Sequence, residues 1–155
     1  MSAEMFYEDV PVGFAFETGG IVVTESHVVA FAGLSGDFFD VHMDDRFAQS
    51  LGFPGRIAHG LLCLAMVDGL KNRAQARFAG VASLSWQWNF RQPVLIDDRI
   101  TARVRVSAKR MTRRPDRGIL TLQFEVCNQG DQVVEDGTNL LLVRTRAGEG
   151  PGSGS

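Results

Sequence analysis

The sequence predicts a single α+β domain in which one long buried helix precedes an antiparallel sheet. Residues 57–77 begin with the almost continuously apolar run IAHGLLCLAMVDGL, which is typical of a helix buried on several sides. After this stretch the hydrophobic period changes from helical to alternate residues. At 155 residues, with 45% hydrophobic and 22% charged residues, the chain is long enough to bury one sizeable core.

The first part of the chain predicts short extended pieces followed by short helices. Residues 10–23 read as two extended segments separated by a turn at Gly19-Gly20. Thr24 can cap a helix that ends near Gly33, with an apolar side formed by Val28, Phe31 and Ala32. Further on, Asp44 can cap a second helix that runs through Ser50 and ends at Gly52.

The second half predicts four strands. Leu84, Trp86, Trp88 and Phe90 alternate with polar residues, and residues 100–109, 120–126 and 133–145 form three further strands. The turn between the strands at 100–109 and 120–126 carries a basic cluster. We interpret this cluster as a solvated hairpin tip or, alternatively, as a site for the phosphates of a nucleotide-bearing thioester. The cluster consists of Lys109, Arg110, Arg113, Arg114 and Arg117.

Composition argues against several classes of partner. The net charge of −2 gives no reason to expect a nucleic acid. The first ten residues, MSAEMFYEDV, lack the basic and apolar regions of a signal peptide, and no apolar run is long enough to span a membrane. We therefore expect a cytoplasmic protein with no membrane association.

Two cysteines and the C-terminal residues complete the outline. Cys63 and Cys127 lie in unrelated segments without metal-ligand spacing, so both are expected to be reduced and buried. Residues 147–155, AGEGPGSGS, cannot bury apolar surface and are predicted to form a flexible tail. The predicted domain therefore covers residues 1–146.

The segment with the most chemical content is SGDFFDVHMDDRFAQSLGFPGRIAHG, residues 35–60. Five residues on a helix correspond to a rotation of roughly 140°, so Asp37 and His42 need a turn through Phe38-Phe39-Asp40 to meet. An Asp and a His that converge can exchange a proton, and the Gly60 amide at a helix start can stabilise an oxyanion. Each residue alone also has a structural interpretation, as a cap, a core histidine and a packing glycine.

This segment resembles the hydratase motif of the MaoC-like enoyl-CoA hydratases and dehydratases. The matching residues are Gly36-Asp37, His42, the acidic pair Asp44-Asp45, and Ile57-Ala58-His59-Gly60. Many family members read Asp-Phe-Asn-Pro-Leu-His where this chain has Asp-Phe-Phe-Asp-Val-His at 37–42. The resemblance covers residues 14–146.

The resemblance implies a hot-dog fold, in which a curled antiparallel sheet wraps a central helix, and a homodimer or higher oligomer. It implies reversible hydration of a 2-enoyl-CoA thioester to an (R)-3-hydroxyacyl-CoA, with no metal or redox cofactor. Asp37 and His42 would hold the water, with His42 assigned as the base and Asp37 left open as the alternative, and Gly60 would bind the thioester carbonyl. Candidate substrate-binding residues are Phe38, Phe39, Phe53, Ile57, His59 and Asp68.

Two other functions fit the same ligand class. In a hot-dog thioesterase, an acid on the central helix activates water, and Asp68 is the feature that points there. In a non-catalytic acyl-CoA-binding module, Asp37 and His42 would only fix the turn. The length and type of the acyl chain and the physiological direction of the reaction do not follow from the sequence.

Overall fold

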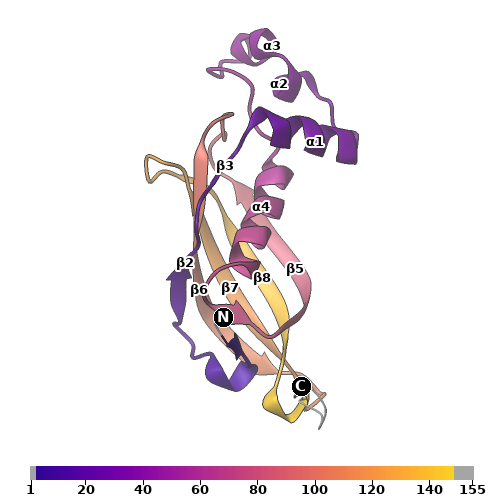
Figure 1. Ribbon diagram of the computed structural model, residues 1–155, viewed down its shortest axis with the longest axis vertical. Helices are drawn as coiled ribbons and strands as arrows, with labels where there is room; N and C mark the ends of the chain where they lie inside the picture. The colour runs from indigo at the N-terminus through magenta and orange to yellow at the C-terminus, as the bar shows by residue number, and fades with distance from the viewer. Residues whose placement is uncertain (1–2, 149–155) are drawn as a thin grey trace.

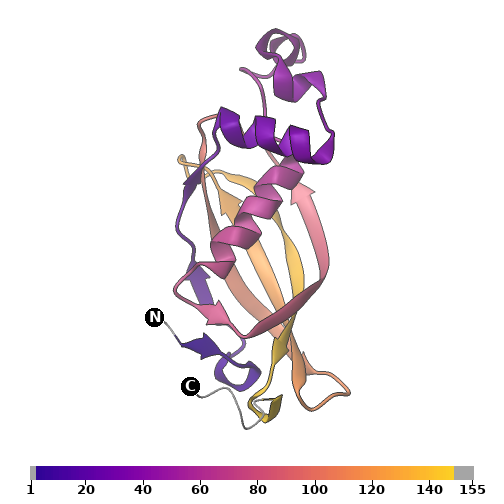
Figure 2. The same ribbon diagram turned by 45° about the vertical axis from the view of Figure 1, so that its right-hand side comes forward.

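In the computed structural model, residues 3–148 form a curled sheet wrapped around one helix (Figures 1 and 2). Four long antiparallel strands make the sheet: β5 (Gly80–Phe90), β6 (Arg99–Met111), β7 (Arg117–Cys127) and β8 (Val133–Arg144). The short strands β2 (Ala15–Glu17) and β3 (Ile21–Val22) both pair with β6. The strand order is β2-β6-β7-β8-β5, so β5 is an edge strand.

The core lies between the concave face of the sheet and helix α4 (Gly60–Asn72). The alternation predicted for β6 and β7 is confirmed, because their core-facing side chains are fully or almost fully buried. Cys63, Val67 and Leu70 of α4 are buried with them. Both cysteines are free and buried, as predicted. On β5, however, Leu84 and Phe90 are exposed, because this strand has a neighbour on one side only.

Helix α4 is shorter at both ends than the predicted residues 57–77. Ile57 and Ala58 are extended instead of helical, because Ile57 bridges Leu95 and the Ala58 amide donates to the Val94 carbonyl. At the other end the helix stops at Asn72. Beyond it β4 (Arg77–Phe78) pairs with β1 (Glu4–Met5), a parallel contact that the sequence analysis missed.

Lys109 does not belong to a solvated hairpin tip. A register shift between Val106 and Ala108 interrupts the alternation of β6. As a result Lys109 is half-buried, and its Nζ donates to the carbonyls of Tyr7 and Val10, both at 2.8 Å. Nearer the tip, Arg114 and Arg117 pair with Asp116, so neither presents a free cation.

Three short helices stand over the N-terminal end of α4 (Figure 2). Thr24 caps α1 (Glu25–Ser35), which ends at Gly36 (φ 80°), three residues beyond the predicted Gly33. Helix α2 (Asp40–Met43) follows, and the Asp44 side chain caps α3 (Asp45–Ser50), as predicted. Helix α1 lies across the first turn of α4 and brings the segment after Gly36 to that helix end.

The described part of the chain ends in a short 3-10 turn, η2 (Arg146–Gly148), so residues 147 and 148 belong to the folded part and not to the predicted tail. The rest of that tail lies outside the described residues. Between residues 3 and 148, none of the helices has the length and apolar character needed to cross a membrane. The cytoplasmic location stays a prediction.

Candidate active site

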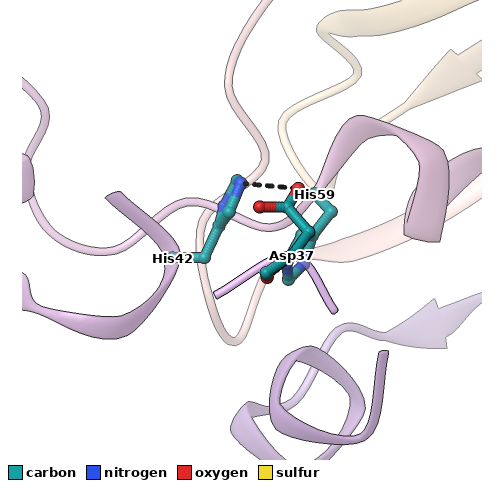
Figure 3. Close-up of side chains that lie close together, drawn as sticks. All are labelled: Asp37, His42 and His59. Atoms are coloured by element: carbon teal, nitrogen blue, oxygen red, sulfur yellow. Dashed lines mark hydrogen bonds and ion pairs between the residues drawn. The ribbon is translucent and has the colours of Figure 1, made fainter. Parts of the chain in front are cut away.

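The structure brings Asp37 and His42 together across the turn that joins α1 to α2 (Figure 3). The Asp37 carboxylate shapes this turn, because its Oδ1 accepts from the Phe39 amide at 3.2 Å. Its other oxygen, Oδ2, lies 3.9 Å from Nε2 of His42. The side chain of Asp37 is half exposed, whereas that of His42 is largely covered. The pair is therefore open to solvent on the side of the acid.

The tautomer of His42 follows from its backbone contact. Nδ1 lies 2.7 Å from the Ile57 carbonyl, which can only accept, so Nδ1 carries the proton. Nε2 of the neutral ring is then an unprotonated acceptor that faces Asp37. The 3.9 Å gap is too long for a direct hydrogen bond. A water about 2.8 Å from each atom would bridge the pair, with an angle of roughly 90° between Oδ2, the water oxygen and Nε2. The two side chains can therefore hold one water between them.

His59 supports this pair from behind. Its ring is 2% exposed, and its Nε2 donates to the backbone carbonyl of Asp37 at 2.9 Å. It stacks on His42 with ring centroids 3.8 Å apart and contacts Phe31 on α1 at 4.9 Å. Its Nδ1 is buried and has no hydrogen-bond partner among residues 3–148. His59 thus fixes the segment that carries Asp37.

Gly60 is the first residue of α4 and stands at the same place. His59, at the N-cap, gives no side-chain hydrogen bond to the first turn, and the amides of that turn have no intrahelical acceptor. A Cβ on Gly60 would lie 2.4 Å from ring carbons of Phe90, so only glycine lets this ring approach the helix end. The positive end of the α4 dipole therefore reaches the surface of the site.

A cavity of about 390 Å3 collects most of the predicted site residues. Its lining includes six of them: Asp37, His42, Phe53, Ile57, His59 and Gly60. Phe38 and Phe39 do not line it; both are exposed, and Phe39 packs edge-on against His42 and Phe47. Neither residue is placed to contact a substrate in this cavity.

Asp68 is also remote from this cavity, contrary to its assignment as a substrate-binding residue. It lines a separate cavity of about 360 Å3 near the C-terminal end of α4. Its Oδ1 accepts from Nζ of Lys71 at 2.7 Å, one turn further along the helix. Lys71 is buried, although it begins the polar part of residues 57–77, KNRAQAR. Asp68 is thus the ion-pair partner of a buried lysine.

Glu135 of β8 was not predicted from the sequence, and it lines the cavity from the side of the sheet. Its carboxyl is 2% exposed and accepts from the Trp88 indole at 2.7 Å. Burial raises the pKa of Glu135 to about 7, and hydrogen bonds from Trp88 and Cys63 offset part of this effect. No local pattern marks this residue, because the strand pairing and the helix that cover it are distant in sequence.

Three side chains of the site could in principle hold a metal ion. One ligand atom each of Asp37, His42 and His59 lies within 4.8 Å of the other two. Neighbouring ligands of a tetrahedral zinc are only about 3.3 Å apart, given zinc–nitrogen distances near 2.0 Å. The three side chains would have to close in to bind zinc, whereas the present spacing already suits a water molecule.

Comparisons with known proteins identify the family. The chain matches the MaoC like domain over residues 10–126. It is 33% identical to 3-hydroxybutyryl-CoA dehydratase of Methylorubrum extorquens, with 90% of this chain and 84% of that protein covered. It is 35% identical to an (R)-specific enoyl-CoA hydratase of Aeromonas caviae, covering 76% and 84% respectively.

Solved structures give the same result. The (R)-hydratase of Aeromonas caviae superimposes with a TM-score of 0.74 at 29% identity, covering 88% of this chain and 98% of that one. A double-hotdog-fold protein of Mycobacterium tuberculosis matches with a TM-score of 0.83 at 19% identity, over 96% of this chain and 47% of that one. This second likeness concerns the fold alone, and the predicted hot-dog fold is confirmed. The chain belongs to the MaoC-like dehydratase family.

Proposed function

We propose that this protein is a hydro-lyase that reversibly adds water to a 2-enoyl-CoA thioester and yields an (R)-3-hydroxyacyl-CoA. One observation carries the proposal: Asp37 Oδ2 and His42 Nε2 lie 3.9 Å apart in the cavity that also contains the α4 helix start. This arrangement supplies a place for a water, a base, and a dipole for developing negative charge.

The reaction begins with the bridging water. Nε2 of His42 accepts one proton as the water oxygen attacks Cβ, while the Asp37 carboxylate holds the second hydrogen. Electrons of the double bond move to the thioester oxygen and form an enolate. The amide of Gly60 stabilises this oxygen, and donors of this type contribute roughly 3–4 kcal/mol. The proton on His42 then passes to Cα on the same face, which restores the base.

The addition of water forms one carbon–oxygen bond and moves one proton without an external oxidant or reductant, and we propose that no metal or redox cofactor takes part. The substrate carries its own activating group, because the thioester carbonyl accepts the charge that develops at Cα. The His42 side chain supplies the proton acceptor and then the proton donor, while the Asp37 carboxylate holds the water. Nucleic acid has no place in this reaction.

The two competing functions receive less support. A thioesterase would need an acid on the central helix near the thioester, and Asp68 lies in the other cavity, paired with Lys71. A binding module would not need an unprotonated His42 Nε2 aimed at a carboxylate across a water-sized gap.

The proposal also includes a homodimer. Among residues 3–148, no strand pairs with the outer edge of β5. Large apolar side chains are exposed along it, at 44% for Val81, 50% for Leu84 and 55% for Phe90. Unpaired edges of this length bind a further strand readily, so a second copy would cover the edge next to the cavity.

The direct test uses crotonyl-CoA and longer 2-enoyl-CoA thioesters. We expect loss of the conjugated enoyl-thioester absorbance without release of free CoA, and an (R)-3-hydroxyacyl product by chiral analysis. Free thiol released at the same rate would support the thioesterase instead. Tight binding of the thioesters without any turnover would support the binding module.

A further inference from the structure

Glu135 occupies a place that an apolar residue would fill at lower cost. It pairs with Phe90 on β5 and Val126 on β7, and the thiol of Cys63 on α4 lies near its carboxyl. The carboxyl is therefore enclosed between the sheet and the first turn of α4. A buried carboxyl loses its hydration, which is unfavourable unless its polar atoms are used. Because Glu135 lines the cavity, a bound ligand can form hydrogen bonds with its carboxyl oxygens.

The local structure holds this carboxyl in place. Trp88 lies opposite Gly137 on β8, and a Cβ on Gly137 would be 2.5 Å from the Trp88 ring. The glycine lets the indole lie against β8, where its N–H reaches Oε2 of Glu135 at 2.7 Å. The Trp88 ring also packs on Phe124. Glu135 is thus fixed by a rigid aromatic side chain.

The carboxyl keeps hydrogen-bonding capacity beyond its bond to Trp88. An ionised carboxyl offers about four lone-pair sites, and the Trp88 indole occupies one of them. In the protonated form the carboxyl also needs an acceptor for its O–H, and the indole N–H of Trp88 cannot be that acceptor. A ligand group that can both donate and accept would satisfy the carboxyl in either state. A hydroxyl group has this property.

The position of Glu135 indicates which part of a thioester it meets. Asp37, His42 and His59 enter the cavity from the helical segments, whereas Glu135 enters from the sheet. The CoA arm must extend to solvent, and the acyl group is the part that goes inward. Most other lining side chains are apolar: Phe31, Phe53, Ile57, Ala58, Leu61, Phe90, Pro93 and Val94.

We propose that Glu135 is a specificity-determining residue that hydrogen-bonds a hydroxyl group on the acyl chain, beyond the reacting carbons. The protein then prefers a hydroxylated 2-enoyl-CoA over the plain alkyl thioester of equal length. This inference rests on the proposed function and names the substrate class of the same site.

The test compares hex-2-enoyl-CoA with its 4-, 5- and 6-hydroxy derivatives. We expect kcat/KM to be roughly 10- to 100-fold higher for at least one hydroxylated substrate, in line with a buried hydrogen bond. Glu135→Val should abolish this preference, mainly by improving the plain substrate. Glu135→Gln keeps a donor and an acceptor and should retain part of it. The matched controls are Glu125→Val and Glu125→Gln, at an exposed position on β7.

Several outcomes would overturn the inference. Equal kcat/KM values of the native enzyme for hex-2-enoyl-CoA and for all three hydroxylated derivatives would overturn it. If Glu135→Val lowers kcat/KM equally for all substrates, the residue contacts the CoA arm or stabilises the fold instead. If no thioester is turned over, the proposed function fails, and calorimetric Kd values for saturated hexanoyl-CoA and its hydroxy derivatives still decide the inference. Trp88→Phe, which frees Oε2, provides a second variant if Glu135→Val does not fold.

Discussion

The imidazole rings of His42 and His59 stack with centroids 3.8 Å apart and planes 27° apart. Each ring has one nitrogen against a backbone carbonyl, that of Ile57 for His42 and that of Asp37 for His59. The two contacts connect the segment before α4 with the turn that carries the acid. His59 therefore sets the position of both members of the pair without reaching the water itself.

Replacing His59 should consequently reduce the rate more than the affinity. His59→Phe keeps the stacked ring but removes the donor to the Asp37 carbonyl, and we expect kcat to fall about 10- to 100-fold with little change in KM. His59→Gln retains a donor and should recover part of the loss. His27→Gln is the matched control, because His27 lies in the first turn of α1, outside the cavity. A native kcat in folded His59→Phe would contradict the positioning role.

The acid and the base should act as one unit. Asp37→Asn removes the carboxylate and His42→Ala removes the ring, and each should lower the hydration rate about 10²- to 10⁴-fold. Because both groups hold a single water, the double variant should be scarcely slower than either single one. Steady-state rates with crotonyl-CoA and circular dichroism of each variant would check this. Additive losses in folded proteins would mean that the two side chains act in separate steps.

Metal removal should leave the activity unchanged, although three possible ligands lie close together. Treatment with EDTA followed by desalting is expected to give the native kcat. Added Zn²⁺ should inhibit, because coordination of His42 Nε2 takes away the lone pair that accepts the proton. His42→Ala should no longer bind zinc in calorimetry. Loss of activity on chelation, with recovery on adding a metal, would refute the metal-free mechanism.

Dimer formation should depend on the exposed edge of β5. Leu84→Lys places a charge on this edge, where lysine opposes pairing, and should shift the protein toward monomer. Leu34→Lys is the matched control, at an exposed leucine of α1. Light scattering at micromolar concentration measures the mass of all three proteins. A native monomer would contradict the proposal.

The sequence was sufficient where one element decides the outcome. Alternation located β6 and β7, and Thr24 and Asp44 marked the starts of α1 and α3. It failed where distant segments meet. Ile57 is extended and not helical, because it pairs with Leu95. Asp68 lines a different cavity from Asp37 and His42, because the two cavities lie at opposite ends of α4.

The site followed the same rule. The spacing of Asp37 and His42 predicted that they meet, because the turn between them is local, and Gly60 lines the same cavity from the start of α4. Glu135 enters from a strand about 100 residues away from Asp37, and its burial depends on β5 and α4 together. The spacing of neighbouring residues does not predict contacts between segments so far apart in the chain. The burial of Glu135 therefore becomes apparent only in the folded structure.

The raised pKa of Glu135 predicts how stability changes with pH. The pKa moves from 4.5 to about 7 on folding, so between these values the native state binds more protons than the unfolded state. The free energy of unfolding should therefore fall as pH rises through this window and level off above it. The shift of about 2.5 units sets an upper bound of roughly 3 kcal/mol for this loss.

Glu135→Gln isolates this effect, because an amide does not titrate while every other group remains. Urea unfolding of both proteins between pH 5 and 8 gives the difference in free energy at each pH. That difference should move in favour of Glu135→Gln as pH rises, with most of the change between pH 5 and 7. A difference that stays constant with pH would show that the carboxyl is hydrated in the native state. It would then cease to be the enclosed polar group on which the preference for a hydroxylated acyl chain depends.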